Sequence, residues 1–244
     1  MDFRSVNRSN GTLVVFVALL MSLVIGFGIF VICFALPRET DTVGTTTRTI
    51  VIDPGHGGMD AGTVGVVTGN KESDLNLMIA QALAADLKAS GFNVVLTRTT
   101  KDGLYGDTSP GFKRRDMQAR AAVIQSCSPT ITVSIHMNKY ASPTRRGAQV
   151  YFQKGDDASM ALANVLQSAL NDELNAAGGR TFEALSGDYY ICKVSPCPAV
   201  IVECGFLSNP EDDRLMATAA YRERLAATIK NGISEYLALM TVAP

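Results

Sequence analysis

Two histidines are the residues of this 244-residue chain whose type and placement most clearly suggest chemistry. His56 closes the run TIVIDPGHGG, and His136 closes the run TITVSIHMN, so each lies where an apolar strand-like run meets a loop. Neutral imidazole is a common ligand for zinc and a frequent proton shuttle. A lone histidine at a strand end is usually a hydrogen-bonded structural residue. A pair at equivalent positions favours a functional site.

The loop DPGHGG, residues 53–58, holds the first histidine among glycines. It is not a dinucleotide-binding loop, because neither register gives G-x-G-x-x-G: the position where the last glycine would stand is Asp60. It is not a phosphate-binding P-loop either, since no Gly-Lys-Ser/Thr follows. The glycines therefore indicate a turn whose backbone closely approaches a bound group.

Glu72 directly precedes an amphipathic run that predicts a helix over residues 73–90. A carboxylate there gains from the positive end of the helix dipole, which is a purely structural explanation. Two histidines and a glutamate, however, form a common catalytic zinc set with one open position for a water. The chain lacks H-E-x-x-H, so spacing alone leaves both interpretations open.

Glu203 closes the apolar run AVIV, residues 199–202. A carboxylate at the end of a buried strand is costly to desolvate unless it is paired or functional. Beside a zinc-bound water it would act as general base and then as proton donor to a leaving amine. The structural alternative is an ion pair inside the core, with Arg120 or Lys193 as partner.

The composition fits one sizeable globular domain with an appendage: 47% of residues are hydrophobic, and the net charge of −1 gives no polycationic surface for nucleic acid. We expect a short cytoplasmic N-terminus (1–12), a transmembrane signal anchor (13–36), a polar linker (37–47) and a catalytic domain (48–240). The cysteines form no C-x-x-C pair, which favours free thiols over a Cys192–Cys197 disulfide.

The predicted anchor is an uncharged run that exceeds the roughly 20 apolar residues needed to cross a bilayer core. Arg4 and Arg8 precede it, which predicts a cytoplasmic N-terminus and an extracytoplasmic catalytic domain at the cell membrane. A cleaved signal peptide has a shorter apolar region of about 7–15 residues, so an uncleaved anchor is favoured and secretion after cleavage is the alternative.

Strand-like and helix-like segments alternate through the rest of the chain. The expected strands are 48–53, 93–97, 130–135, 148–152 and 199–203, and the expected helices are 73–90, 112–126, 157–176 and 220–239. This alternation predicts a single α/β domain with a mostly parallel twisted sheet and helices on both faces. Ligands of such folds bind beyond the C-terminal ends of the strands, where His56, His136 and Glu203 fall.

Over residues 49–239 the chain resembles the zinc-dependent N-acetylmuramoyl-L-alanine amidases of the type-3 family. The resemblance rests on several blocks in the same order: IVIDPGHGGMDAG, KESDLNLMIAQALAADL, NVVLTRTT, TVSIHMN, RGAQVYF and PAVIVECGFLSNPEDDRLM. It implies that His56, Glu72 and His136 bind Zn²⁺ and that Glu203 is the catalytic residue. It also implies an α/β fold, in agreement with the pattern above.

The resemblance further matches Arg120 to an arginine that precedes the S-I-H strand. The chain departs from the family at two places. The family often has H-x-N-A after the strand, whereas this chain has His136-Met137-Asn138-Lys139. The family commonly has an arginine before the last block, whereas this chain has Lys193. The basic loop 139–146 could steer the carboxylates of a stem peptide, or it could be a solvated loop. The residues that we predict to bind substrate are Arg120, Asn138, Lys139, Arg146 and Lys193.

An N-terminal membrane segment and one catalytic domain without wall-binding repeats are similar to the sporulation and germination amidases of the CwlD type. This resemblance implies hydrolysis of the amide between the N-acetylmuramoyl lactyl group and L-alanine in peptidoglycan, in spore cortex on the way to muramic δ-lactam. It also implies a possible need for an activating protein partner. The alternatives are a membrane-tethered peptidoglycan-binding scaffold with an inactive site, and a different zinc peptidase or deacetylase.

Overall fold

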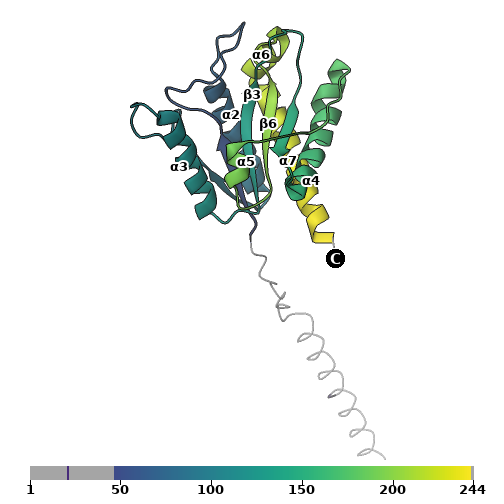
Figure 1. Ribbon diagram of the computed structural model, residues 1–244. Coiled ribbons are helices and arrows are strands. Elements are labelled where there is room, and N and C mark those ends of the chain that lie inside the picture. The colour runs from purple at the N-terminus through teal and green to yellow at the C-terminus, as the bar shows by residue number, and fades with distance from the viewer. Residues whose placement is uncertain (1–20, 22–46, 243–244) are drawn as a thin grey trace, which may run out of the picture. The chain divides into compact units, whose positions relative to one another are not determined.

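The computed structural model describes Met21 and residues 47–242 (Figure 1). The predicted catalytic domain, 48–240, lies within the described part. The predicted cytoplasmic segment and almost all of the predicted anchor and linker lie outside it. Among the described residues, no helix is both long and apolar enough to cross a membrane.

Six strands form one sheet in the order β2-β1-β3-β6-β4-β5. Strands β2, β1, β3 and β6 run parallel, whereas β4 is antiparallel to β6 and parallel to β5. The predicted α/β domain is confirmed, and its sheet is mixed. The strands are β1 (Thr49–Pro54), β2 (Asn93–Leu96), β3 (Ile131–Asn138), β4 (Gln149–Gln153), β5 (Leu185–Gly187) and β6 (Ala199–Phe206).

Helices cover the two faces of the sheet unequally. One face packs against α2 (Glu72–Ala89), α4 (Asp157–Leu170) and α7 (Ala219–Val242), which share the large apolar core. Helices α3 (Phe112–Ser126) and α5 (Tyr190–Val194) lie over the other face (Figure 1). A smaller apolar cluster lies beneath them. Helix α6 (Pro210–Ala217) follows β6 and is capped by Asn209, whose side chain accepts hydrogen bonds from amides of the first turn.

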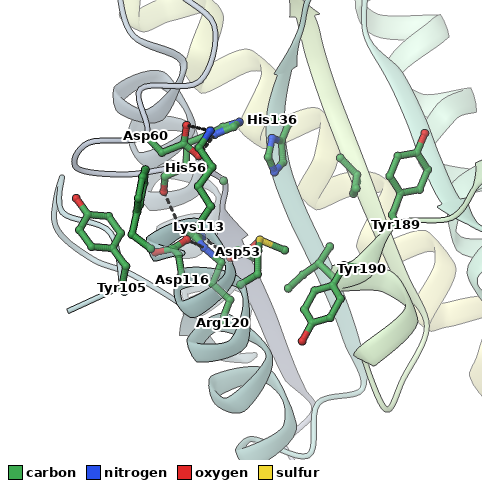
Figure 2. A pocket seen from close by; sticks show the side chains of 15 residues that line it. Asp53, His56, Asp60, Tyr105, Lys113, Asp116, Arg120, His136, Tyr189 and Tyr190 are labelled. Carbon is green, nitrogen blue, oxygen red and sulfur yellow. Dashed lines mark hydrogen bonds and ion pairs between the residues drawn. The ribbon is translucent and has the colours of Figure 1, made fainter. Parts of the chain in front are cut away.

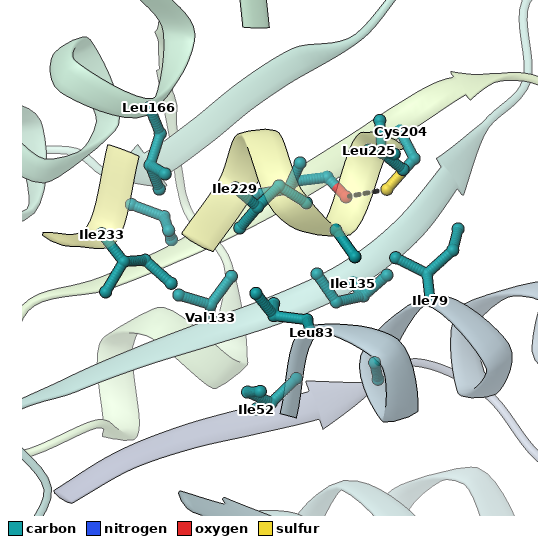
Figure 3. Close-up of a cluster of buried hydrophobic side chains, with 14 of the residues drawn as sticks. Ile52, Ile79, Leu83, Val133, Ile135, Leu166, Cys204, Leu225, Ile229 and Ile233 are labelled. Atoms are coloured by element: carbon teal, nitrogen blue, oxygen red, sulfur yellow. Dashed lines mark hydrogen bonds between the residues drawn. The ribbon is translucent and has the colours of Figure 1, made fainter. Parts of the chain in front are cut away.

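Strand β3 shows why the two faces differ. Side chains alternate along a strand, so Ile131, Val133 and Ile135 enter the large core whereas Ser134 and His136 turn to the other face. Figure 3 shows this apolar side of the sheet, where Val133 and Ile135 lie among side chains from α2 and α7. The face under α3 and α5 is therefore the one that carries polar groups at the strand ends.

The predicted helix 157–176 changes form at its end. Helix α4 stops at Leu170, and a π-helical turn (Asn171–Asn175) and a 3-10 turn (Ala176–Gly178) follow. The side chain of Asn175 explains the change, because it accepts a hydrogen bond from the amide of Ala148 and donates one to its carbonyl. Four cysteines in the described region are free thiols, as expected: Cys127, Cys192, Cys197 and Cys204.

Candidate metal and catalytic site

Three potential metal ligands converge at the C-terminal ends of β1 and β3. His56 follows β1, Glu72 begins α2, and His136 lies in β3. Glu72 Oε1 is 3.1 Å from His56 Nε2 and 3.1 Å from His136 Nδ1. One ligand atom from each residue falls within 4.8 Å of the others, which is close enough for all three to hold one metal ion. The structure thus brings together the residues that the sequence singled out.

Two glycines make room for these side chains. The imidazole of His136 packs directly against Gly55, so a Cβ there would overlap the ring. A Cβ on Gly62 would lie 2.5 Å from Glu72 Oε2. The sequence predicted that glycines of the loop around His56 let the backbone approach a bound group closely. In the structure, the groups that lie against these two glycines are the side chains of the potential ligands His136 and Glu72.

The backbone of His56 is held in a strained conformation. Its φ of 60° lies in the left-handed region, which costs a residue with a side chain about 1–3 kcal/mol. Two buried arginines fix the carbonyls of this loop: Arg98 donates to Pro54 and Gly55, and Arg120 donates to Pro54 and His56. These bonds hold the loop in the conformation that aims the imidazole at Glu72.

Asp60 orients the imidazole of His56, and the sequence reasoning missed this role. His56 Nδ1 lies 2.9 Å from Asp60 Oδ2, and Lys113 Nζ donates to Asp60 Oδ1 at 2.9 Å (Figure 2). Burial opposes protonation of His56, but the carboxylates of Glu72 and Asp60 raise its pKa. A carboxylate on one ring nitrogen fixes the tautomer and leaves the other nitrogen free for a metal. The sequence does contain a signal for this role, because in GHGGMD the carboxylate of Asp60 follows His56 by four residues.

Glu72 is a buried carboxylate that stays ionised. Burial opposes its ionisation, but hydrogen bonds and charge interactions with His136 and His56 hold its pKa far below the usual range. The amide of Thr63 donates to Oε2 at 2.7 Å, and the amide of Met137 donates to Oε1 at 3.1 Å. This carboxylate therefore has a fixed position and a negative charge, as a metal ligand requires.

Arg120, predicted to bind substrate, is only 1% exposed and forms hydrogen bonds inside the protein. It donates to Asp53 at 2.7 Å and to Asp116 at 2.6 Å, in addition to the loop carbonyls (Figure 2). Burial opposes ionisation of Asp53, but Arg120, Thr97 and Ser134 hold its pKa below the usual range. These contacts give Arg120 a structural role beneath the metal ligands. Its role in substrate binding stays a prediction.

Glu203 lies directly beside His136, because the two residues are register partners in the parallel pair of β3 and β6. Within the described residues its Oε2 is buried without a hydrogen-bond partner, and neither Arg120 nor Lys193 pairs with it. Burial raises the pKa of Glu203 to about 7; the charge of Glu72 adds to this, and the two histidines oppose it. A carboxylate with this pKa can accept and return a proton near neutral pH.

The other predicted substrate residues occupy different surroundings. Asn138 donates to the Tyr151 hydroxyl at 3.4 Å, and Lys139 is exposed in the following loop. Arg146 is tied to α6 by ion pairs with Asp212, at 3.2 Å, and with Glu211. Lys193 is exposed on α5, where it lies 3.6 Å from Asp188.

A cavity of about 350 Å³ opens beside the two histidines (Figure 2). Its walls are mostly apolar and aromatic and come from the loop before α3, from α3 itself and from α5. Tyr105 brings in the irregular loop 99–111, and Tyr189 and Tyr190 form the wall near α5. A space of this size accommodates a small-molecule group or one sugar ring.

Comparison with known proteins supports the functional interpretation of this site. A family model described as N-acetylmuramoyl-L-alanine amidase matches residues 50–235. The germination-specific N-acetylmuramoyl-L-alanine amidase of Bacillus subtilis is 30% identical over 192 residues, which cover 78% of this chain and 79% of that protein.

Solved structures agree. The CwlD amidase of Clostridioides difficile, in complex with the GerS lipoprotein, matches with a TM-score of 0.75 and 31% identity, over 79% of this chain and all of that one. The amidase AmiC2 of Nostoc punctiforme matches with a TM-score of 0.67 and 30% identity, over 78% of this chain and 97% of that one.

Proposed function

Because the chain belongs to the N-acetylmuramoyl-L-alanine amidase family and is a peptidoglycan amidase, we propose that it works with zinc held by His56, Glu72 and His136. The donor set supports this proposal, because two imidazoles and one carboxylate are a common catalytic zinc set that leaves a position open. The Asp60 carboxylate on the far nitrogen of His56 is the usual outer partner of a zinc-binding histidine.

The observation that carries the catalytic proposal is the unpartnered carboxylate of Glu203 beside His136. A buried carboxylate without a partner is costly, so its retention at this position favours a catalytic use. The structural alternative, an ion pair within the core, has no support in the described contacts. Glu203 is therefore the general base of the proposed reaction.

Zinc supplies Lewis acidity, which polarises an amide carbonyl and acidifies water. Glu203 accepts a proton from the attacking water while the new C–O bond forms at the lactyl carbonyl carbon. The carboxylate then returns this proton to the departing nitrogen as the C–N bond breaks. The products are the lactyl carboxylic acid and the free amino group of L-alanine, so one water is consumed for each bond cut.

The finer biological role is also a proposal. The similarity to a germination-specific amidase and to CwlD supports spore cortex peptidoglycan as the substrate, with muramic δ-lactam formation as the consequence. The complex of that CwlD with GerS supports an activating protein partner for this chain. The apolar run at residues 13–36 supports an anchored enzyme whose catalytic domain faces outward from the cell membrane.

Mass spectrometry of digested peptidoglycan tests this function. The protein, loaded with zinc, is incubated with cortex and with vegetative peptidoglycan, beside Glu203→Gln as the matched inactive control. We expect new L-alanine amino termini with the wild type only, and more of them from cortex. Released acetate or cleavage within the stem peptide would instead indicate a deacetylase or a peptidase.

A further inference from the structure

We infer that Arg145 is a specificity residue that binds the free carboxylate of the stem-peptide residue following L-alanine. The inference rests on the proposed function and extends it, because it gives the peptide a direction across the site. It places the acidic part of the substrate over β4, on the far side of Glu203 from the metal ligands.

A row of side chains across the sheet sets this direction. His136 of β3 is the register partner of Glu203 of β6, and Glu203 is the register partner of Gln149 of β4. Directly paired residues point to the same face, so these three side chains line one polar face. Arg145 Nη2 donates to Gln149 Oε1 at 2.9 Å, which places the guanidinium at the end of the row.

The length of the row fits a short peptide. Neighbouring strands lie about 4.8 Å apart, so Gln149 is roughly 10 Å from His136 along the sheet. An extended chain advances about 3.3–3.6 Å per residue, so L-alanine and the next residue reach about 7 Å from the scissile carbonyl. The head of Arg145, next to the amide of Gln149, lies within reach of a carboxylate at that point.

Arg145 carries a charge that no carboxylate neutralises among the described residues. The single described hydrogen bond of its guanidinium goes to the neutral Gln149, and its Nε is buried without a partner among the described residues. Its sequence neighbour Arg146 is different, because that side chain forms ion pairs with Glu211 and Asp212. A half-buried guanidinium with unused donors is suited to bind a carboxylate supplied by a ligand.

Three aromatic rings hold this guanidinium in place. Its carbon lies 5.6 Å from the ring centre of Tyr140, 5.5 Å from that of Phe182 and 5.6 Å from that of Phe206. Cation–π contacts fix the position of the group and leave its N–H donors unused. Little ordering is therefore needed when a carboxylate binds, which favours affinity.

Binding to the catalytically inactive full-length protein tests the inference without turnover. Glu203→Gln, loaded with zinc, is titrated with the γ-methylamide of N-acetylmuramoyl-L-alanyl-D-glutamate and with the γ-methylamide of the matching D-isoglutamine compound, in which an amide replaces the α-carboxylate. The γ-carboxyl group is blocked in both compounds, so they differ only at the α-carboxylate. We expect the carboxylate compound to bind at least about tenfold more tightly, as a charge-assisted hydrogen bond at a preorganised site implies. The added change Arg145→Gln should bring this ratio close to one, and Arg145→Lys should keep part of it.

Lys154→Gln is the matched control, because it removes one positive charge at an exposed position just beyond the far end of β4. It should leave the ratio unchanged. Equal binding of the two compounds, or a preference that survives Arg145→Gln, would overturn the inference. Retained binding of the amide compound by Arg145→Gln would show that the variant is folded. A carboxylate preference combined with a wild type that cuts no peptidoglycan would refute the catalytic proposal instead.

Discussion

Replacing Glu203 by glutamine should make the metal-free protein more stable at neutral and alkaline pH. In the part of the chain that the structure describes, Oε2 of this carboxylate is buried without a hydrogen-bond partner, and burial raises its pKa from 4.5 to about 7. Between these two values the unfolded chain has lost a proton that the folded chain retains. The stability of the wild type therefore falls as pH rises through this window, and the full penalty applies above pH 7.

The size of the effect follows from the two pKa values. They differ by about 2.5 pH units, and each unit is worth 1.36 kcal/mol, so the ionised carboxylate costs the folded state about 3 kcal/mol at pH 8. Glutamine has nearly the same shape and cannot ionise. The free energy of unfolding of Glu203→Gln should thus match that of the wild type near pH 4.5 and exceed it by about 3 kcal/mol at pH 8.

Urea unfolding of both proteins from pH 4.5 to pH 8, with a chelator present, measures this difference. The other titrating groups are common to both proteins and largely cancel. A difference that stays constant across the range would refute the assignment of a raised pKa to Glu203. In the zinc-loaded enzyme the same variant should lose about 100-fold to 10,000-fold in turnover, the usual contribution of a general base. The wild type should lose activity toward acidic pH, because protonated Glu203 cannot accept a proton.

Three further changes test the scaffold of the site. Gly55→Ala should displace the His136 imidazole and weaken zinc binding in a chelator competition assay; unchanged affinity would show that the loop can yield to a methyl group. Asp60→Asn should lower zinc affinity by about 10-fold to 100-fold, since it loosens the orientation of His56; an effect on turnover alone would contradict this. Arg120→Ala should lower the free energy of unfolding by about 3–5 kcal/mol in urea unfolding, because two buried carboxylates lose their partner; a loss confined to substrate affinity would favour its predicted binding role.

The regular alternation of apolar and polar residues made most of the fold predictable. In TITVSIHMN polar and apolar residues alternate, and this period of two agrees with the faces that the side chains of β3 take in the structure. Strand β5 and helix α5 were missed because three and five residues are too few to show a period. The early end of α4 depends on a side-chain bond between Asn175 and Ala148, which lie 27 residues apart, and no local pattern reveals such a bond.

The central residues of the site could also be predicted from the sequence. Residue type and position at strand ends singled out His56, His136 and Glu203, and the resemblance assigned their roles. The resemblance also identified Glu72, for which position at the start of a helix allowed a purely structural explanation. The surroundings were harder, because they depend on contacts between distant segments. The ion pair between Arg120 and Asp53 spans 67 residues, so the structural role of Arg120 could not be inferred from the sequence. Arg145 and Arg146 are adjacent in the chain, and only their partners in space distinguish them.

The unequal covering of the sheet has a consequence for how the molecule opens. Helices α2, α4 and α7 share the large core, whereas α3 and α5 rest on a much smaller cluster. Sub-global opening follows the size of the apolar contact that must be broken, so the amides of α3 and α5 should exchange with deuterium at a lower free energy than those of α7. The side that carries the candidate site can then loosen while the rest of the domain stays closed. Under the proposed function, a bulky polymer strand would gain access without global unfolding.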